Sequence, residues 1–194
     1  MIDLFGVETA DDSLPRFHLD IAGVCSGATQ IPSPNCDQRP DESLISLLVV
    51  HNISLPPNEF GGDGVIELFT NRLDPARHPY YETIKDLRVS SHFFIRRDGE
   101  LMQFVPCELR AWHAGVSQWN GRERCNDFSI GVELEGADDI AYADAQYDTL
   151  ADLGGALFRH YGILDTVGHS DIAPGRKTDP GAAFDWKRFL ARVA

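Results

Sequence analysis

A short, nearly continuous apolar run, Ile45-Ser-Leu-Leu-Val-Val50, constrains the fold of this chain more than any other segment. Such a run is typical of a strand that is buried on both faces of a sheet. A second segment, Ser129–Glu135, alternates strictly, so that Ile130, Val132 and Leu134 face one way and Glu133 and Glu135 the other. Both segments are therefore predicted to be strands of a mixed sheet with helices packed on it.

Helical patterns surround these strands. Asp144–His160 carries a broad apolar face, with Asp144 as the expected cap and Gly162 as the expected end. A closing helix is expected at 184–193, and short helices at 65–69 and 80–87, within a long excursion (53–87) that we expect to border the functional site. Segments 89–95 and 101–105 read as a hairpin around Asp98-Gly99. Residues 1–43 are punctuated by Gly and Pro and are expected to be weakly structured.

The prediction is a single-domain α/β (α+β) fold in which helices flank a central mixed sheet. A length of 194 residues fits one domain. The formal net charge of −13 argues against nucleic acid or an anionic membrane surface as a partner. The first twenty residues lack a basic and an apolar signal region, so we expect a cytoplasmic protein. The four cysteines form no Cys-x-x-Cys pair, which disfavours a thiolate zinc site.

Polar chemistry is concentrated in Gly168–Gly181, which contains His169, two carboxylates (Asp171, Asp179) and two cations (Arg176, Lys177). Two Pro-Gly steps within it predict turns rather than a helix or strand. Loops this dense in polar groups are usually functional.

Zinc binds His nitrogens and carboxylate oxygens, and His51, His169 and Asp179 could supply three ligands. Amide hydrolysis at such a metal also needs a base and a donor for the oxyanion. Glu133 or Glu135 could be the base, although for Glu135 a place on a solvated face is favoured. Lys177 could meet the oxyanion, or be a surface lysine.

The other polar residues have plainer interpretations. His92, inside a strand, is expected to be structural, whereas His113 could line a pocket. Asp171 has no chemical assignment and is expected to be structural.

Several motifs occur together in the chain: Leu48-Val-Val-His-Asn-Ile-Ser-Leu-Pro-Pro57, Arg88-Val-Ser-Ser-His92, Ala111-Trp-His-Ala-Gly-Val-Ser117 and Gly121-Arg-Glu-Arg-Cys-Asn-Asp-Phe-Ser-Ile-Gly-Val-Glu-Leu-Glu-Gly136. Together with the loop 168–181, they resemble the N-acetylmuramoyl-L-alanine amidases, and most closely the cytoplasmic anhydro-muramoyl type. The resemblance runs from about Ile31 to the C-terminus. It therefore implies an amidase domain at 31–194 and an N-terminal extension of unknown role at 1–30.

The resemblance implies the fold of peptidoglycan recognition proteins and phage T7 lysozyme, with Zn²⁺ held by His51, His169 and Asp179. It implies Glu133 as the catalytic carboxylate and Lys177 as the transition-state stabiliser. The implied reaction cleaves the amide between the lactyl group of anhydro-N-acetylmuramic acid and L-alanine in soluble muropeptides, during peptidoglycan recycling. Substrate contacts are implied, less firmly, at Asn52, Arg88, Trp112, His113, Ala114 and Arg176.

The expected partner is thus a muropeptide, and the expected state a monomer. Two alternatives remain open: a muropeptide-binding module on the same fold without catalysis, and an amidase acting on polymeric peptidoglycan in the periplasm. The complete set of proposed ligands and catalytic groups disfavours the first, and the acidic composition without a signal segment disfavours the second.

Overall fold

The structure is a computed structural model that describes residues 15–193. Its centre is a six-stranded sheet in the order β12-β5-β11-β6-β7-β3. The first four strands are parallel, β7 is antiparallel to β6, and β3 is parallel to β7. The predicted mixed sheet is therefore confirmed, with its strands at β12 (Asp165–Gly168), β5 (Leu47–Ile53), β11 (Ser129–Glu135), β6 (Phe93–Ile95), β7 (Leu101–Gln103) and β3 (Thr29–Gln30).

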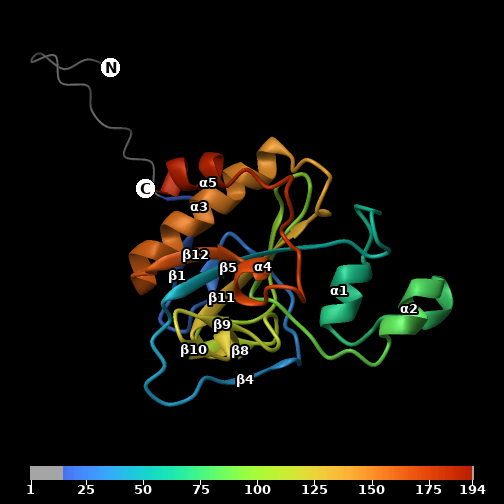
Figure 1. Ribbon diagram of the computed structural model, residues 1–194, viewed down its shortest axis with the longest axis horizontal. Coiled ribbons are helices and arrows are strands. Elements are labelled where there is room, and N and C mark those ends of the chain that lie inside the picture. Colours follow the sequence, from blue (N-terminus) through green and yellow to red (C-terminus); the bar gives the residue numbers. More distant parts are fainter. Residues whose placement is uncertain (1–14, 194) are drawn as a thin grey trace, which may run out of the picture.

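Both faces of this sheet are covered, as the apolar run in β5 predicts. The helices α3 (Asp144–Tyr161) and α5 (Trp186–Val193) lie together on one face (Figure 1). They pack on the even-numbered residues of β5 and β11, including Leu48, Val50 and Val132. Odd-numbered residues such as Val49 pack on the other side, with Ile172 of α4 (His169–Ile172). The helices α1 (Gly64–Phe69) and α2 (Pro79–Ile84) pack on the same side, against Phe94.

Burial on both faces overturns the expectation that Glu135 lies on a solvated face. Every residue of β11 is buried, and Glu135 is only 3% exposed. Its carboxylate instead accepts hydrogen bonds from the backbone N–H groups of Gly61 (2.5 Å) and Arg97 (3.0 Å). Alternation identified the side of the strand correctly, but it could not show that loops cover that side.

The helices match the predicted segments, although α2 ends at Ile84 and not at residue 87, and α5 begins at Trp186 and not at residue 184. The capping of α3 also differs. The helix α3 ends at Gly162, which adopts the left-handed conformation (φ 63°), as expected. Its N-cap, however, is Ala143 and not Asp144. The side chain of Gln146 reaches back to accept the Ala143 N–H (3.0 Å), so the first turn is satisfied from inside the helix.

The hairpin prediction is confirmed at its turn and wrong at its two outer ends, since the second strand ends at Gln103 and not at residue 105. Gly99 occupies the turn with φ +86°, a conformation that favours glycine. The first strand begins at Phe93 and not at residue 89, because Ser90 is bound to two loops and not to a neighbouring strand. Ser90 Oγ donates to Asn35 O and accepts from Trp112 N.

Residues 18–38 are more ordered than their composition predicts. They form β1 (His18–Leu19), β2 (Cys25–Ser26), β3 and β4 (Cys36–Gln38), and Phe17 and Cys25 are buried in the core. The buried side chain of Gln103 binds Cys25 N and Gly23 O, which gives these short segments partners for their backbone groups. Residues 1–14 lie outside the described part of the chain, and the domain boundary at residue 31 stays a prediction.

The remaining elements are short. They are η1 (Pro75–Arg77), η2 (Cys125–Asp127) and three strands: β8 (Leu109–Ala111), which pairs with β4, and β9 (Gln118–Trp119), which pairs with β10 (Arg122–Glu123). Among residues 15–193, no helix combines the length and the apolar character needed to cross a membrane.

Candidate active site

Three neighbouring parallel strands bring polar residues to one level at their carboxyl ends. His51 on β5 is the register partner of Glu133 on β11. On the other side of β5, Gly168 of β12 pairs with Val50, so His169 follows at the level of His51. The carboxyl edge of parallel strands is where α/β proteins place their sites.

A candidate metal centre lies at this edge. His51 Nδ1 and His169 Nδ1 are 2.9 Å apart, and they lie 3.1 and 3.0 Å from the same Asp179 oxygen, Oδ2. The structure thus brings the three predicted ligands together, with their ligand atoms within 4.8 Å of one another. They form a His₂-Asp donor set, which suits a catalytic zinc with an open position.

The hydrogen bonds around the three atoms support a cation rather than a proton. His169 Nε2 lies 3.0 Å from the carbonyl oxygen of Ala114, which can only accept, so Nε2 carries the hydrogen and Nδ1 a lone pair. A hydrogen on His51 Nδ1 could be donated to His169 Nδ1 or to Asp179 Oδ2, but not fully to both. A cation between the three atoms would satisfy all of them at once.

Burial and charge keep the ligands in coordinating forms. Burial lowers the pKa of His51 to about 4, so its imidazole is neutral at pH 7. Burial acts to raise the pKa of the Asp179 carboxyl, but the close contacts of its oxygen with the imidazoles of His169 and His51 outweigh that effect and hold its pKa well below the usual range. Burial also lowers the pKa of His92 and of His113 well below the ordinary value.

The loop 168–181 holds two of these ligands at a fixed separation. Contrary to the expectation of turns alone, His169–Ile172 forms one turn of helix, because Asp171 Oδ2 accepts the Gly168 N–H at 2.7 Å. This confirms a structural role for Asp171. A backbone bond from Ser170 N to Asp179 O (2.9 Å) then joins the two ends of the loop. Gly181 needs its glycine: φ is +78°, and a Cβ there would lie 2.1 Å from Asp138 Cα.

Glu133 lies beside the metal centre and is 8% exposed. Burial raises its pKa well above the ordinary value, and the nearby charge of Asp179 raises it further, against an opposing effect of Lys177. Its Oε2 is buried without a hydrogen-bond partner among residues 15–193. A carboxyl group in this setting is suited to exchange a proton with a neighbouring water or substrate group. Glu135, bound to two backbone N–H groups, has no such freedom.

A cleft of about 690 Å³ opens over these residues. One wall is apolar and comes from the excursion 53–87, which confirms that this region borders the site. The other wall is polar and includes two aspartates, Asp138 and Asp139, that sequence reasoning missed. They follow β11 closely, so the same carboxyl-edge rule could have found them. The lining includes, on the apolar wall, Leu68, Phe69, Tyr80 and Ile84, and on the polar wall, Asn52, Glu133, Asp138, Asp139, Lys177 and Asp179.

The predicted substrate contacts divide into two groups. Asn52, Trp112, His113 and Arg176 line the cleft. Arg88 is exposed, is not among the lining residues, and donates to the carbonyls of Lys85 and Leu87. Ala114 is buried, and only its backbone oxygen takes part in the site: it accepts from His169 and from Arg176 (2.8 Å).

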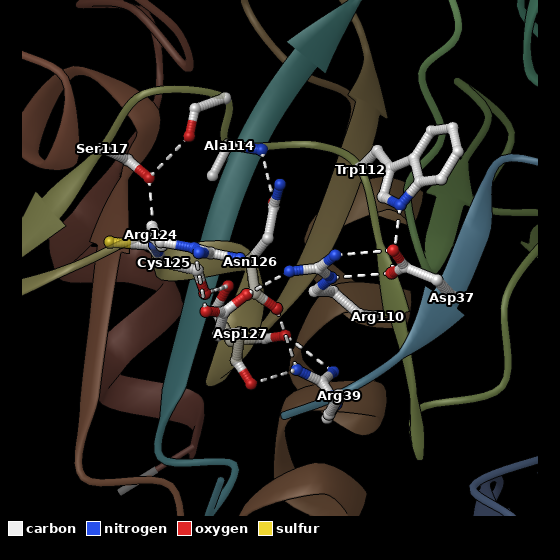
Figure 2. A network of polar contacts seen from close by, with 12 residues as sticks. Asp37, Arg39, Arg110, Trp112, Ala114, Ser117, Arg124, Cys125, Asn126 and Asp127 are labelled. Carbon is white, nitrogen blue, oxygen red and sulfur yellow. Dashed lines mark hydrogen bonds and ion pairs between the residues drawn. The ribbon is translucent and has the colours of Figure 1, made fainter. Parts of the chain in front are cut away.

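A network of polar contacts fixes the segment Trp112–Ala114 (Figure 2). Asn126 Oδ1 accepts the backbone N–H groups of His113 (3.2 Å) and Ala114 (2.8 Å). Arg110 bridges Asp37 on β4 to Asp127 on η2, and Asp37 also accepts from Trp112 Nε1 (3.2 Å).

The base of this network is Arg39. Its guanidinium donates to the carbonyls of Cys107, Asn126, Asp127 and Ser129, and it lies 3.0 Å from His92 Nε2. His92 Nδ1 accepts the Gly131 N–H at 3.0 Å, which confirms the structural role expected for His92.

Comparison with known proteins identifies the class of protein that has this sheet, this donor set and this adjacent carboxyl group. The family model for N-acetylmuramoyl-L-alanine amidase matches residues 41–182, and the chain belongs to this family.

Particular relatives share most of their length with the chain. The 1,6-anhydro-N-acetylmuramyl-L-alanine amidase AmpD of Escherichia coli (strain K12) is 59% identical over 170 residues, which cover 87% of this chain and 93% of the relative. A crystal structure of a selenomethionine derivative of AmpD is 58% identical, with a TM-score of 0.88, and the match covers 91% of this chain and 99% of the other. A complex of AmiD from E. coli with anhydro-N-acetylmuramic acid-L-Ala-D-γ-Glu-L-Lys is 28% identical, with a TM-score of 0.57, over 80% of this chain and 60% of the other.

Proposed function

We propose that this protein is a zinc-dependent amidase that cleaves the bond between the lactyl group of anhydro-N-acetylmuramic acid and L-alanine in soluble muropeptides. The observation that carries the proposal is the convergence of His51, His169 and Asp179 beside Glu133, whose buried Oε2 has no hydrogen-bond partner among residues 15–193. The similarity to AmpD over most of both chains supports the same reaction.

In this proposal His51, His169 and Asp179 hold the zinc ion. When bound there, zinc would polarise the scissile carbonyl and lower the pKa of a coordinated water. Glu133 takes a proton from the attacking water and delivers it to the amine of L-alanine as the C–N bond breaks. Lys177 neutralises the negative charge that develops on the carbonyl oxygen. The apolar side chains that α1 and α2 contribute to the cleft would contact the substrate.

The form of the cleft supports a substrate with an apolar or sugar portion and carboxylates. The protein carries a net charge of −13, yet Arg176 and Lys177 stand together at the cleft. These cations would attract the carboxylates of a stem peptide. AmiD, a more distant relative, binds an anhydro-muramoyl tripeptide.

The test is mass spectrometry of the products formed from an anhydro-muramoyl tripeptide and, in parallel, from intact sacculi. We expect free tripeptide from the first and little release from the second, and we expect chelation to stop the reaction and added zinc to restore it. Binding without cleavage would support the non-catalytic module instead. Cleavage of sacculi at the same rate would support an amidase that acts on polymer. Full activity in metal-free protein would refute the zinc assignment.

We further propose a monomeric enzyme that acts in the cytoplasm during peptidoglycan recycling, on the basis of the motif resemblance. Cell fractionation with a native-level tagged chain tests the location, and light scattering at several concentrations tests the oligomeric state. Recovery in the periplasmic fraction, or a mass that doubles with concentration, would overturn the respective proposal.

A further inference from the structure

The metal ligand His51 contacts a second imidazole on the side away from the metal centre. His51 Nε2 and His113 Nδ1 are 2.9 Å apart, and the two rings meet edge-on with centroids 5.0 Å apart. A hydrogen bond here requires one hydrogen between two nitrogens, so its direction decides which nitrogen of His51 keeps a lone pair for the metal.

The direction of this bond can be worked out from a fixed end. Ser129 Oγ lies 2.6 Å from the carbonyl oxygen of Cys125, which only accepts, so the serine hydroxyl donates its single hydrogen to that oxygen. His113 Nε2 lies 3.2 Å from the same Oγ and must therefore be the donor. His113 is packed against the rings of His51 and His92, without a carboxylate partner among the described residues, and is neutral; its Nδ1 then holds a lone pair.

His113 Nδ1 is thus the acceptor, and His51 Nε2 the donor. The hydrogen of His51 is held on Nε2, and Nδ1 faces His169 and Asp179 with a free lone pair. We propose that Ser129 and His113 form a relay of hydrogen bonds that locks His51 in the tautomer able to bind metal, so that His113 acts as a positioning residue and not only as a cleft-lining substrate contact. The role of the relay in metal binding rests on the zinc proposal above, whereas the directions of its hydrogen bonds do not.

The His113 ring packs directly against the backbone of Gly131. A Cβ on Gly131 would lie 2.6 Å from both Cγ and Nδ1 of that ring, so the glycine gives His113 its position against β11. On the other side, Asn126 Oδ1 accepts the His113 N–H and fixes its main chain. Ser129 and Gly131 lie on the same face of β11 as Glu133, and the relay is therefore built into the strand that also carries the candidate base.

The relay is tested with variants that differ in hydrogen bonding and not in size. His113→Leu removes the acceptor for His51, whereas His113→Asn is nearly isosteric with leucine and offers an amide oxygen near the place of Nδ1. Ser129→Ala removes the acceptor that orients His113. Ser33→Ala is the matched control, because Ser33 is also buried and its hydroxyl also donates to a carbonyl, that of Phe69, away from the histidines.

Two readouts are needed. In zinc-free protein, long-range ¹⁵N–¹H spectra of the histidines report the tautomer of His51, which we expect to carry hydrogen on Nε2 in the wild type and Ser33→Ala, and to shift towards Nδ1 in Ser129→Ala and His113→Leu. Zinc affinity, measured by competition with a chelating dye, should fall about 10- to 100-fold in these two variants. It should stay close to wild type in His113→Asn.

A hydrogen on Nδ1 of His51 in the zinc-free wild type would overturn the relay, as would wild-type zinc affinity in both Ser129→Ala and His113→Leu. The spectra do not depend on zinc. A wild-type protein that shows the expected tautomer but binds no zinc would therefore refute the zinc assignment while leaving the relay in place.

Discussion

Glu133 and His51 are register partners on the adjacent parallel strands β11 and β5. Parallel pairing places their side chains on the same face and at the same height, so the candidate base and a candidate metal ligand are set side by side by the sheet itself. Sites built on strands are held more rigidly than sites built on loops. The third and fourth members of the site, His169 and Asp179, come from the loop that follows the next strand.

The two glutamates of β11 are expected to differ sharply when each is replaced by glutamine. Glu133→Gln should lower kcat by roughly 10²- to 10⁴-fold, because it removes the group that exchanges the proton, while zinc binding persists. Steady-state kinetics and metal analysis of the purified variant measure both. Near-normal turnover would show that another group is the base.

Glu135→Gln is the matched comparison and should act on stability. It replaces a carboxylate oxygen that accepts the Gly61 or Arg97 N–H, so we expect a loss of about 1–3 kcal/mol in the free energy of unfolding. Urea denaturation measures this loss. An unchanged midpoint together with a collapse in turnover would reverse the two assignments.

Lys177→Met is expected to lower kcat by roughly 10²- to 10³-fold with a smaller effect on KM, because the charge is needed most when the oxyanion forms. Lys187→Met, an exposed lysine on α5, is the control and should leave both parameters unchanged. If Lys177→Met changed KM alone, the lysine would bind substrate without acting on the transition state.

The metal-free protein should lose stability as the pH falls from about 6.5 towards 4. His51 has a pKa of about 4 in the folded protein, below its ordinary value of 6.5, so the unfolded chain binds more protons in this window and stability rises with pH. At 1.36 kcal/mol per pKa unit, the contribution is on the order of 3 kcal/mol. Urea denaturation of chelator-treated protein across this range tests it, and His51→Gln should make the dependence shallower, while the buried His92 and His113, whose pKa values are also lowered, keep part of it. A wild-type profile as flat as that of the variant would contradict the buried neutral imidazole.

Arg39→Met should cost at least about 3 kcal/mol of unfolding free energy, because it leaves several buried carbonyls without their charged donor. Lysine should not restore it, since one ammonium cannot reproduce the planar fork of donors. Arg159→Met, at an exposed position on α3, serves as the control in thermal and urea denaturation. A loss no larger than that of the control would mean that water replaces the guanidinium.

Much of the architecture could be predicted from local patterns. The run Ile45–Val50, the alternation in Ser129–Glu135 and the helix ended by Gly162 each report burial or a backbone conformation that depends on nearby residues. The N-terminal strands could not be predicted in this way. They depend on Gln103, a residue far along the chain that supplies hydrogen bonds to Cys25 and Gly23.

The site shows the same division. The convergence of His51, His169 and Asp179 was suggested by residue types and by the motif resemblance, since spacing alone does not bring them together. The burial of Glu135 and the backbone role of Ala114 were not predictable, because both depend on loops that return from elsewhere in the chain. Ser129 was also missed: a serine at the start of a strand carries no signal until His113 is placed beside it.

One face of β11 carries Ser129, Gly131, Glu133 and Glu135, in steps of two residues. Ser129 orients an imidazole, Gly131 leaves it room, Glu133 faces the cleft and Glu135 braces the surrounding loops. A shift of this strand by a single residue would turn the whole face inwards and present Ile130, Val132 and Leu134 to the substrate. Misaligned molecules would lack the candidate base and the hydrogen-bond relay at the cleft, and they would therefore be inactive and not merely slower.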